Sequence, residues 1–174
     1  MSAVAKPVAL PFDPIRRAAE LWRSRWGARS VPAAMASATS IMRVQQLLLA
    51  DFDEAVGRHG LTFARYEALV LLAFSREGHL PMSKIGRRLM VHPTSVTNIV
   101  QRLAAQGLVE RAPNPADGRG ILTTITAQGR EVMEAATRDL VAEGFSLGVL
   151  TSAEHEQLFT LLRKVRIAAG DFAG

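Results

Sequence analysis

Apolar residues recur every three to four positions in the N-terminal part of the chain, and this spacing predicts two helices. Residues 13–27, DPIRRAAELWRSRWG, begin with Asp13 as N-cap and Pro14 at the first helical position, and Gly27 follows the end. The apolar stripe of this helix consists of Ile15, Ala19, Trp22 and Trp26. Residues 33–57 predict a long second helix, and residues 1–12 are expected to form a flexible tail.

The pattern changes to shorter elements in the middle of the chain. FARYEALVLLAF, residues 63–74, is apolar nearly all round, so we expect a buried helix with Thr62 as its cap. HLPM at 79–82 fits one small strand, and SKIGRRLM at 83–90 fits a helix of two turns.

The clearest helix signal is VHPTSVTNIVQRLAAQG, where His92 or an adjacent residue caps the start and Gly107 ends the helix. LVERAP and ILTTIT are rich in β-branched residues and flank the turn-forming stretch NPADGRG, so they predict a hairpin. Thr126 starts a further helix to about residue 143. A capping box, Thr151 to Glu154, opens the last helix.

Composition narrows the class of protein. The 174 residues are 48% hydrophobic and include no cysteine, so disulfides and thiolate metal sites are excluded. No stretch approaches the apolar length of a signal peptide or a membrane span, so we expect a cytoplasmic protein without a membrane partner. The net charge is +5, and residues 76–130 alone carry eight Lys and Arg against three Asp and Glu. This basic middle segment favours a polyanionic partner.

A short helix, a tight turn, a second helix and a hairpin follow the order of a winged helix-turn-helix. On the second of these helices Val96, Ile99, Val100 and Leu103 share one side. The other faces are small, polar and free of carboxylates, which suits the base edges of a major groove. Its candidate DNA contacts are Thr94, Ser95, Thr97, Asn98, Gln101 and Arg102. The alternative is an ordinary solvated helix face, but such faces usually carry Glu and Lys.

Further basic residues fit contacts with DNA outside the major groove. Lys84, Arg87 and Arg88 on the preceding helix are candidate phosphate contacts or, equally, solvated charges. Arg119 at the hairpin tip is a candidate for the flanking minor groove, supported by Asp117, which can bond the loop backbone or the guanidinium. The alternative for Asp117 and Arg119 is a surface ion pair of little energetic value.

With these motifs in place, residues 33–170 resemble the MarR family of winged helix-turn-helix transcriptional regulators in element order and length. The most specific part is VHPTSVTNIVQRLAAQGLVERAPNPADGRGILTTITAQGR, which is similar to the recognition helix, the wing with Asp-x-Arg and the closing helix start of that family. The resemblance implies a mainly α fold with a small β-wing. It also implies obligate homodimers that bind pseudo-palindromic operators in double-stranded DNA, commonly as repressors released by small ligands.

The resemblance also implies a division of the chain. Residues 61–126 would form the winged helix-turn-helix DNA-binding domain, and residues 33–58 and 127–170 a helical dimerisation region. The interface itself would lie at residues 33–57 and 151–170. The sequence agrees, because those helices carry apolar stripes that are difficult to bury within one small domain.

The extra N-terminal helix is similar to that of the branch of the family that responds to urate and other anionic metabolites. By this resemblance Trp22 or Trp26, Glu67 and Arg111 would line a pocket for a small anionic or aromatic effector, and no other cofactor is implied. Here the acid is Glu rather than Asp, and Asn98 stands where that branch has a second arginine. The alternatives are core tryptophans and a structural Glu67–Arg111 ion pair.

An enzyme is the main competing class of function. The four histidines are scattered without metal-ligand spacing, and neither a Gly-rich phosphate loop nor a nucleophile elbow is present. We therefore expect no catalytic residues and no metal site. The nearer alternative is a winged helix used for protein contact or for non-specific DNA coating.

Overall fold

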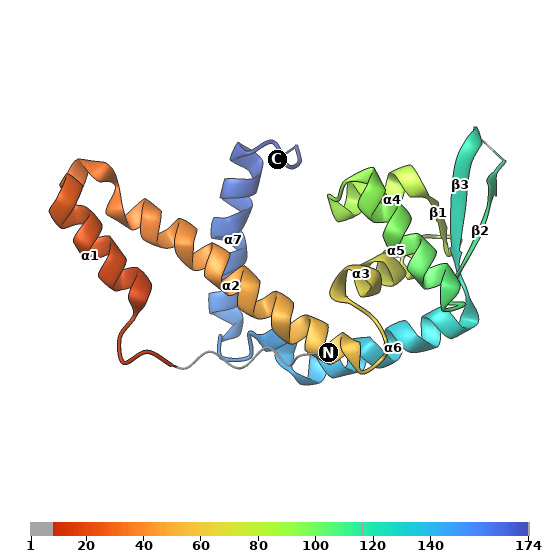
Figure 1. The fold of residues 1–174 in the computed structure, drawn as a ribbon, viewed down its shortest axis with the longest axis horizontal. Coiled ribbons are helices and arrows are strands. Elements are labelled where there is room, and N and C mark those ends of the chain that lie inside the picture. Colours follow the sequence, from red (N-terminus) through yellow and green to blue (C-terminus); the bar gives the residue numbers. More distant parts are fainter. Residues whose placement is uncertain (1–8, 116, 174) are drawn as a thin grey trace. The chain divides into compact units, whose positions relative to one another are not determined.

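The computed structural model describes the backbone of residues 9–115 and 117–173, and it describes side chains in the same ranges apart from residues 117–119. The chain divides into two compact units, with the boundary between Leu49 and Ala50. This boundary falls inside one long helix, α2 (Pro32–Gly57). The mainly helical fold with a small sheet, predicted from the sequence, is confirmed (Figure 1).

The first unit consists of α1 (Pro14–Trp26), the short 3-10 turn η1 (Ala28–Ser30) and the first part of α2. The Asp13 side chain accepts hydrogen bonds from the backbone N–H groups of Ile15 and Arg16, as an N-cap should. Gly27 follows α1 with φ +76°, which ends the helix at the predicted position. Of the predicted tail, residues 1–8 lie outside the described residues, and residues 9–12 are exposed without helix or strand.

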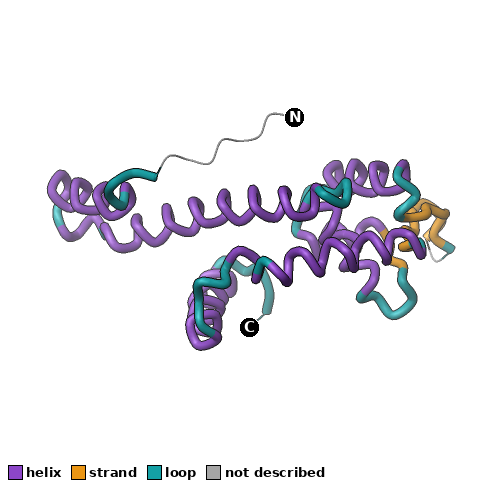
Figure 2. Tube along the Cα trace, turned by 90° about the horizontal axis from the view of Figure 1, so that it is seen from below, coloured by secondary structure: helices purple, strands orange, loops and turns teal. Residues whose placement is uncertain are grey.

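The second unit contains the remaining elements. Its helices are α3 (Phe63–Ala73), α4 (Met82–Leu89), α5 (Pro93–Ala105), α6 (Ala127–Ala142) and α7 (Ser152–Ala168). The strands β1 (His79–Pro81), β2 (Val109–Asn114) and β3 (Asp117–Ile125) form an antiparallel sheet in the order β1-β3-β2. The sheet is the small group of strands at one end of this unit in Figure 2.

One apolar core holds this unit together, and it is built from the helices and the sheet. The largest of its fully buried residues are Val56, Leu69, Leu72, Ile85, Val96, Val100, Leu103 and Leu140. Ile125 and Val109 join the sheet to the same core. Because α5 contributes three of the largest buried side chains, its inner face is fixed and its outer face is left to solvent.

Local signals placed most helix ends correctly. Thr126 and Thr151 cap α6 and α7, and the Thr151–Glu154 capping box is present. Thr62 stands at the N-cap position of α3, but its side chain does not cap the helix. Instead Asp53 Oδ1 accepts the Phe63 N–H at 2.6 Å. The cap is therefore supplied by a residue of α2, ten positions earlier in the chain.

Thr123 in β3 is the one buried polar side chain of the described core without a hydrogen-bond partner. We expect Thr123→Val to raise the free energy of unfolding by about 1 kcal/mol, because valine has the same shape and no hydroxyl to desolvate. Urea denaturation of the two proteins measures the difference.

Thr126→Val provides the matched control for that substitution. The Thr126 hydroxyl donates to the Gly107 carbonyl and accepts from Gly129 N–H, so its loss should cost about 1 kcal/mol. A destabilised Thr123→Val variant would contradict the assignment of an unpaired hydroxyl.

Candidate nucleic-acid interface

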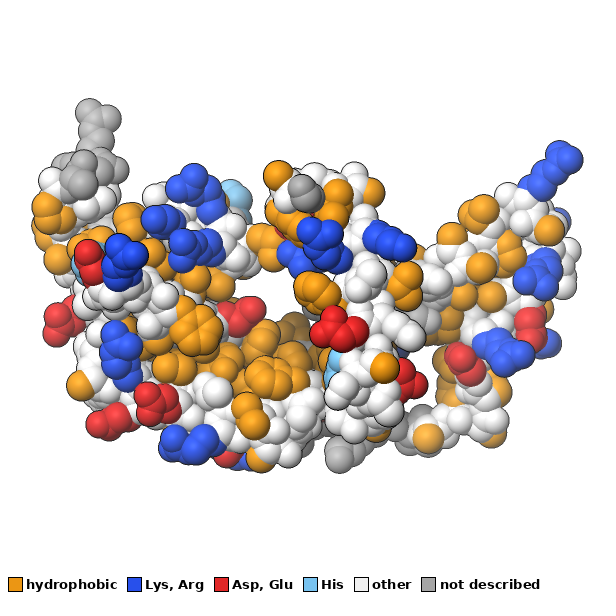
Figure 3. Space-filling model, turned by 180° about the vertical axis from the view of Figure 1, so that it is seen from behind, with side chains coloured by type: hydrophobic (Ala, Val, Ile, Leu, Met, Phe, Trp, Pro, Cys, Tyr) orange, Lys and Arg blue, Asp and Glu red, His pale blue; other side chains and the backbone are white. Residues whose placement is uncertain are grey.

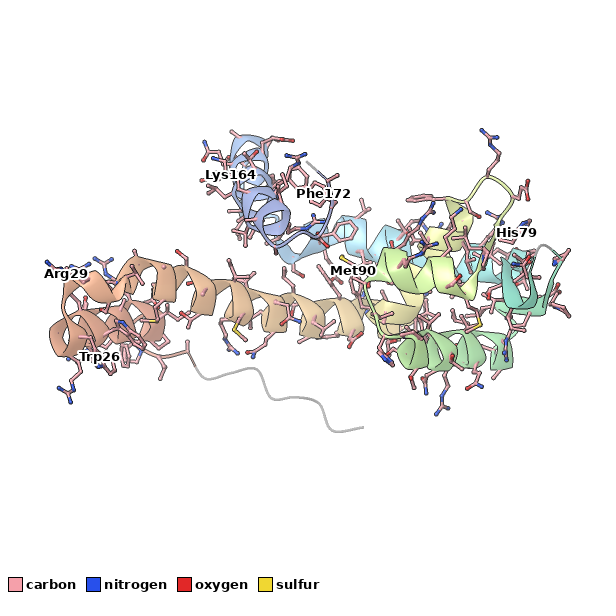
Figure 4. All side chains as sticks on the ribbon, turned by 90° about the horizontal axis from the view of Figure 1, so that it is seen from above. Trp26, Arg29, His79, Met90, Lys164 and Phe172 are labelled. Atoms are coloured by element: carbon pink, nitrogen blue, oxygen red, sulfur yellow. The ribbon has the colours of Figure 1, made fainter. Side chains whose placement is uncertain are left out.

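The two helices α4 and α5 are joined by a tight turn whose geometry is set by Met90. Met90 has φ +54°, in the left-handed region, and its backbone N–H donates to the Gly86 carbonyl and closes α4. The turn ends at His92, whose Nδ1 accepts a hydrogen bond from Thr94 N–H at 3.3 Å. Pro93 then occupies the first position of α5. Met90 is labelled in Figure 4.

The predicted division of α5 into a buried and an exposed side is confirmed. Val96, Val100 and Leu103 are at most 2% exposed. The candidate base contacts Thr94, Ser95, Asn98, Gln101 and Arg102 are all exposed. This side of α5 carries hydrogen-bonding groups and no carboxylate.

Thr97 differs from the other candidates on α5. Its side chain is half-buried, and its hydroxyl donates to the Pro93 carbonyl of its own helix at 3.1 Å. The hydroxyl therefore has lone pairs but no donor to offer to a base edge. Thr97 is better suited to packing beside a base than to a bidentate contact.

The candidate phosphate contacts on α4 are exposed cations. Arg87 and Arg88 lie in its last turn, Lys84 lies one turn earlier, and none of them forms an ion pair within the described part of the chain. A guanidinium or ammonium without a carboxylate partner can neutralise a phosphate without first breaking an ion pair. The helix α4 that carries these cations directly precedes α5 in the chain and packs against it in the fold.

The predicted hairpin is the β2–β3 wing. Its strands pair from Val109 opposite Ile125 to Asn114 opposite Asp117, with an irregularity between Pro113 and Asn114. The backbone of Asp117 and Arg119 belongs to β3. Their side chains lie outside the described residues, so the minor-groove role of Arg119 and the supporting role of Asp117 stay predictions.

Sequence reasoning missed a hollow between α4 and α5 with a volume of about 530 Å³. Gly86 lies in its lining, and α4 and α5 pack closely there, because a Cβ at Gly86 would approach Val96 Cγ2 to 3.0 Å. Its lining combines apolar side chains with three polar ones: Met82, Ser83, Gly86, Arg87, Met90, Val91, Pro93, Val96 and Thr97.

The two tryptophans of the expected effector pocket belong to the first unit. Their ring centroids are 4.5 Å apart, and Trp22 Nε1 donates to the Ser30 carbonyl at 3.0 Å. α1 has no buried residue, and Trp26 is 60% exposed. The alternative interpretation of both tryptophans as core residues is therefore wrong for the single chain. Figure 4 labels Trp26.

The acid and the arginine of that pocket belong to the second unit. Glu67 on α3 and Arg111 on β2 are both exposed, and they form no ion pair in the described structure. The expected charge pair is thus absent, because each side chain faces solvent from its own element. Partial desolvation still raises the pKa of the Glu67 carboxyl above its ordinary value.

Over the described ranges, no three His, Asp or Glu side chains come together in a way that could hold a metal ion. Among the helices of those same ranges, none combines the length and the apolar character that crossing a bilayer requires.

Comparison with known proteins places this geometry in a family. The model of the MarR family matches residues 59–120. The HTH-type transcriptional repressor IacR of Pseudomonas putida is 32% identical over 128 residues, which cover 72% of this chain and 74% of the repressor. The chain spans about half the length of the first mycobacterial regulators that it matches, at 36% identity over 78 residues.

Solved structures agree with the sequence relatives. The MarR family regulator Sco5413 of Streptomyces coelicolor is 60% identical, with a TM-score of 0.76, and the match covers 82% of this chain and 99% of that one. Sco3205 from the same organism, solved in complex with DNA, is 25% identical with a TM-score of 0.70, covering 75% and 87%. By its helix-turn-helix, its wing and these relatives, the chain belongs to the MarR family of transcriptional regulators.

Proposed function

We propose that two copies of this chain bind a pseudo-palindromic operator in double-stranded DNA and thereby regulate transcription, as a repressor. The exposed side of α5 carries this proposal. It presents hydroxyl, amide and guanidinium groups without a carboxylate, on a helix whose other side is locked in the core. Such a helix can enter a major groove and pair with base edges without repelling the phosphates.

The relatives support the proposal in two ways. IacR is a repressor by name, and Sco3205 was solved with DNA on a fold that this chain shares. The free cations of α4 add a sequence-independent attraction to the phosphates, which positions the protein without specifying sequence. A regulator of this kind acts in the cytoplasm, where its operator lies, and needs no catalytic residue.

The homodimer is supported by apolar side chains that a single chain leaves exposed. On α7, Leu158, Leu161 and Val165 recur at i, i+3 and i+7 on one side and are 37–61% exposed, and α7 has no buried residue. On the first-unit part of α2, Ile41 is 46% and Met42 is 64% exposed. Figure 3 shows hydrophobic side chains at the molecular surface. A second copy would cover such patches, since contiguous apolar surface usually marks an interface.

The C-terminal end of α7 is ordered by local contacts that suit a helix kept at an interface. Phe172 lies beneath two guanidiniums, with Arg163 Cζ at 5.2 Å and Arg166 Cζ at 5.0 Å from its ring centroid (Figure 4). Arg166 Nε also donates to Asp171 at 2.6 Å. The tail therefore turns back on the side of the helix that carries the two arginines. Sedimentation equilibrium of the purified chain tests the dimer, and a monomer at micromolar concentration would contradict it.

A small anionic or aromatic effector is the second part of the proposal. The supporting feature is a pair of exposed indoles, Trp22 and Trp26, whose ring centroids lie 4.5 Å apart with the ring planes tilted by 52°. Exposed indoles offer flat apolar area for a planar ligand. A ligand bound there would have to favour one orientation of the DNA-binding helices over another to release the operator.

Isothermal titration of the wild type and of Trp22→Phe against urate and citrate tests the effector. We expect heat from one of these anions with the wild type and at least a severalfold weaker affinity with Trp22→Phe. Phenylalanine offers the ligand less aromatic area, and it lacks the N–H that fixes the indole on the Ser30 carbonyl. Equal heats for both proteins would remove Trp22 from the site.

The competing function is a winged helix that coats DNA without preference for sequence. A gel-shift competition separates the two functions at physiological salt. The proposal expects operator-containing duplexes to compete at least a hundredfold better than random duplexes, within the usual range of specific over non-specific binding. Equal competition by all duplexes would favour the coating role.

A further inference from the structure

The turn between α2 and α3 is tied to α6 by three polar contacts. Arg58 Nη2 lies 2.7 Å from Glu143 Oε1, and Arg58 Nη1 lies 3.4 Å from Asp139 Oδ2. His59 Nε2 lies 2.9 Å from the same Asp139 oxygen. The hydrogen bond from His59 holds the pKa of the Asp139 carboxyl below its ordinary value. Two consecutive residues thus hold this end of the turn on α6.

The next part of the same turn is tied to the end of α5. The Gly60 carbonyl accepts one hydrogen bond from Gln106 Nε2 at 3.0 Å and a second from Arg65 Nη1 at 3.1 Å. Arg65 Nη1 also donates to Gln106 Oε1 at 3.1 Å, so the three groups close a triangle. Arg65 Nε donates to Thr62 Oγ1, which fixes the guanidinium from its other edge. We call Gly60, Arg65 and Gln106 the helix-end clamp.

The clamp acts at the C-terminal end of α5. Gln106 is the C-cap of α5, and its side chain bridges to an element outside the helix. The buried side of α5 is held by apolar contacts, which are not directional. Hydrogen bonds are directional and weaken steeply with misalignment. The clamp ties α5 to the turn between α2 and α3 and therefore restricts tilt and rotation that packing alone would permit.

The clamp is not needed to hold the unit together. Gln106 and Gly60 are both exposed, so water can replace their hydrogen bonds in the unfolded and folded chain alike. The core beneath α5 is complete without them, with Val100 and Leu103 fully buried. Loss of the clamp should change the orientation of α5 more than the stability of the fold.

We propose that Gln106, held by Arg65 and the Gly60 carbonyl, is a positioning residue that sets the orientation of α5 and hence how sharply the protein distinguishes its operator from other DNA. This inference rests on the proposed function, because it assigns a role in sequence reading. Direct contacts to base edges require side chains placed within a few tenths of an ångström. Phosphate contacts through long, flexible cations tolerate a reorientation of α5 far better.

Competitive fluorescence anisotropy with an operator duplex and a random duplex tests the proposal on the full-length protein. Gln106→Ala should lower the ratio of operator affinity to random-duplex affinity about tenfold, while affinity for the random duplex and its salt dependence stay unchanged. Arg65→Ala should lower the ratio similarly, and the double variant should lower it no further, because both residues belong to one clamp. Gln128→Ala is the matched control, since it removes an exposed amide on α6 that forms no hydrogen bond in the described structure.

Hydrogen exchange of the free protein separates this inference from the proposed function. Backbone amides of residues 103–108 should exchange several times faster in Gln106→Ala than in the wild type, while those of α3 and α6 should not change. The positioning role would be overturned if the affinity ratio stayed unchanged or if affinity fell equally for both duplexes. It would also be overturned if the exchange at residues 103–108 stayed unchanged. A wild type that prefers no duplex but shows the exchange difference would instead overturn the proposed function and leave the clamp as a purely structural device.

Discussion

Gly129→Ala is expected to lower the free energy of unfolding of this chain by about 3 kcal/mol, near the upper end of the usual cost of overpacking. A Cβ at Gly129 would overlap the carbonyl oxygen of Leu108, and it would come within 3.0 Å of Ile125 Cγ1. The clash cannot be relieved by a rotamer change, because the nearest atom belongs to the backbone that leads from α5 into β2. Urea denaturation followed by circular dichroism measures the loss.

Gly57→Ala is the matched control, because it makes the same chemical change at the last residue of α2. Nothing lies within 4 Å of a Cβ at Gly57. Alanine has the higher helix propensity, so this variant should be neutral or more stable by up to about 1 kcal/mol. Similar stabilities for the two variants would contradict the close contact between Gly129, at the start of α6, and the Leu108 carbonyl.

Asn98→Ala is expected to cost about 1–3 kcal/mol of operator affinity for each half-site and to relax preference at one base pair of that half-site. Asn98 is exposed at the centre of the polar side of α5, and an amide can pair with adenine through two hydrogen bonds. A homodimer carries the change twice. Anisotropy titrations against the operator and its single-base variants measure both effects.

Two outcomes of this experiment are informative beyond the affinity itself. The slope of affinity against salt should stay unchanged, because Asn98 is neutral and displaces no counterion from the DNA. Folding should be unaffected, since the side chain is exposed. An Asn98→Ala protein with full affinity and full base preference would contradict the assignment of this side of α5 to the major groove.

The helix limits that sequence reasoning placed correctly depend on contacts within a few residues. Asp13, Thr126 and Thr151 cap helices by accepting N–H groups two or three positions away. Such bonds are encoded in a short window of sequence. The two sides of α5 were predictable for a similar reason, because a period of 3.6 residues separates Val96 and Val100 from Asn98 without knowledge of the fold.

The features that sequence reasoning missed depend on contacts between distant segments. Asp53 replaces Thr62 as the cap of α3 because the two helices meet in the fold. Phe74, included in a helix expected to be buried, is 84% exposed because α3 ends at Ala73. Glu67 and Arg111 were paired by resemblance alone, and the structure leaves them apart.

The conformation of Met90 was also not predictable from the sequence, because methionine rarely adopts the left-handed backbone conformation found there. A methionine at φ +54° is unusual, since glycine or asparagine normally occupies this region. The turn between α4 and α5 is short, and in this conformation the Met90 N–H donates to the Gly86 carbonyl. The left-handed conformation is required by the turn between the two helices, and the residue type at position 90 does not indicate it.

Selection of bound sites from random double-stranded DNA by the purified chain, followed by footprinting of the enriched sequence, tests the central claim most directly. We predict one enriched pseudo-palindrome whose half-sites are centred about 10 base pairs apart, protected on one face of the duplex by two copies of the chain. Binding of DNA without enrichment of any motif would contradict sequence-specific binding. A footprint produced by one copy of the chain would contradict binding as a homodimer.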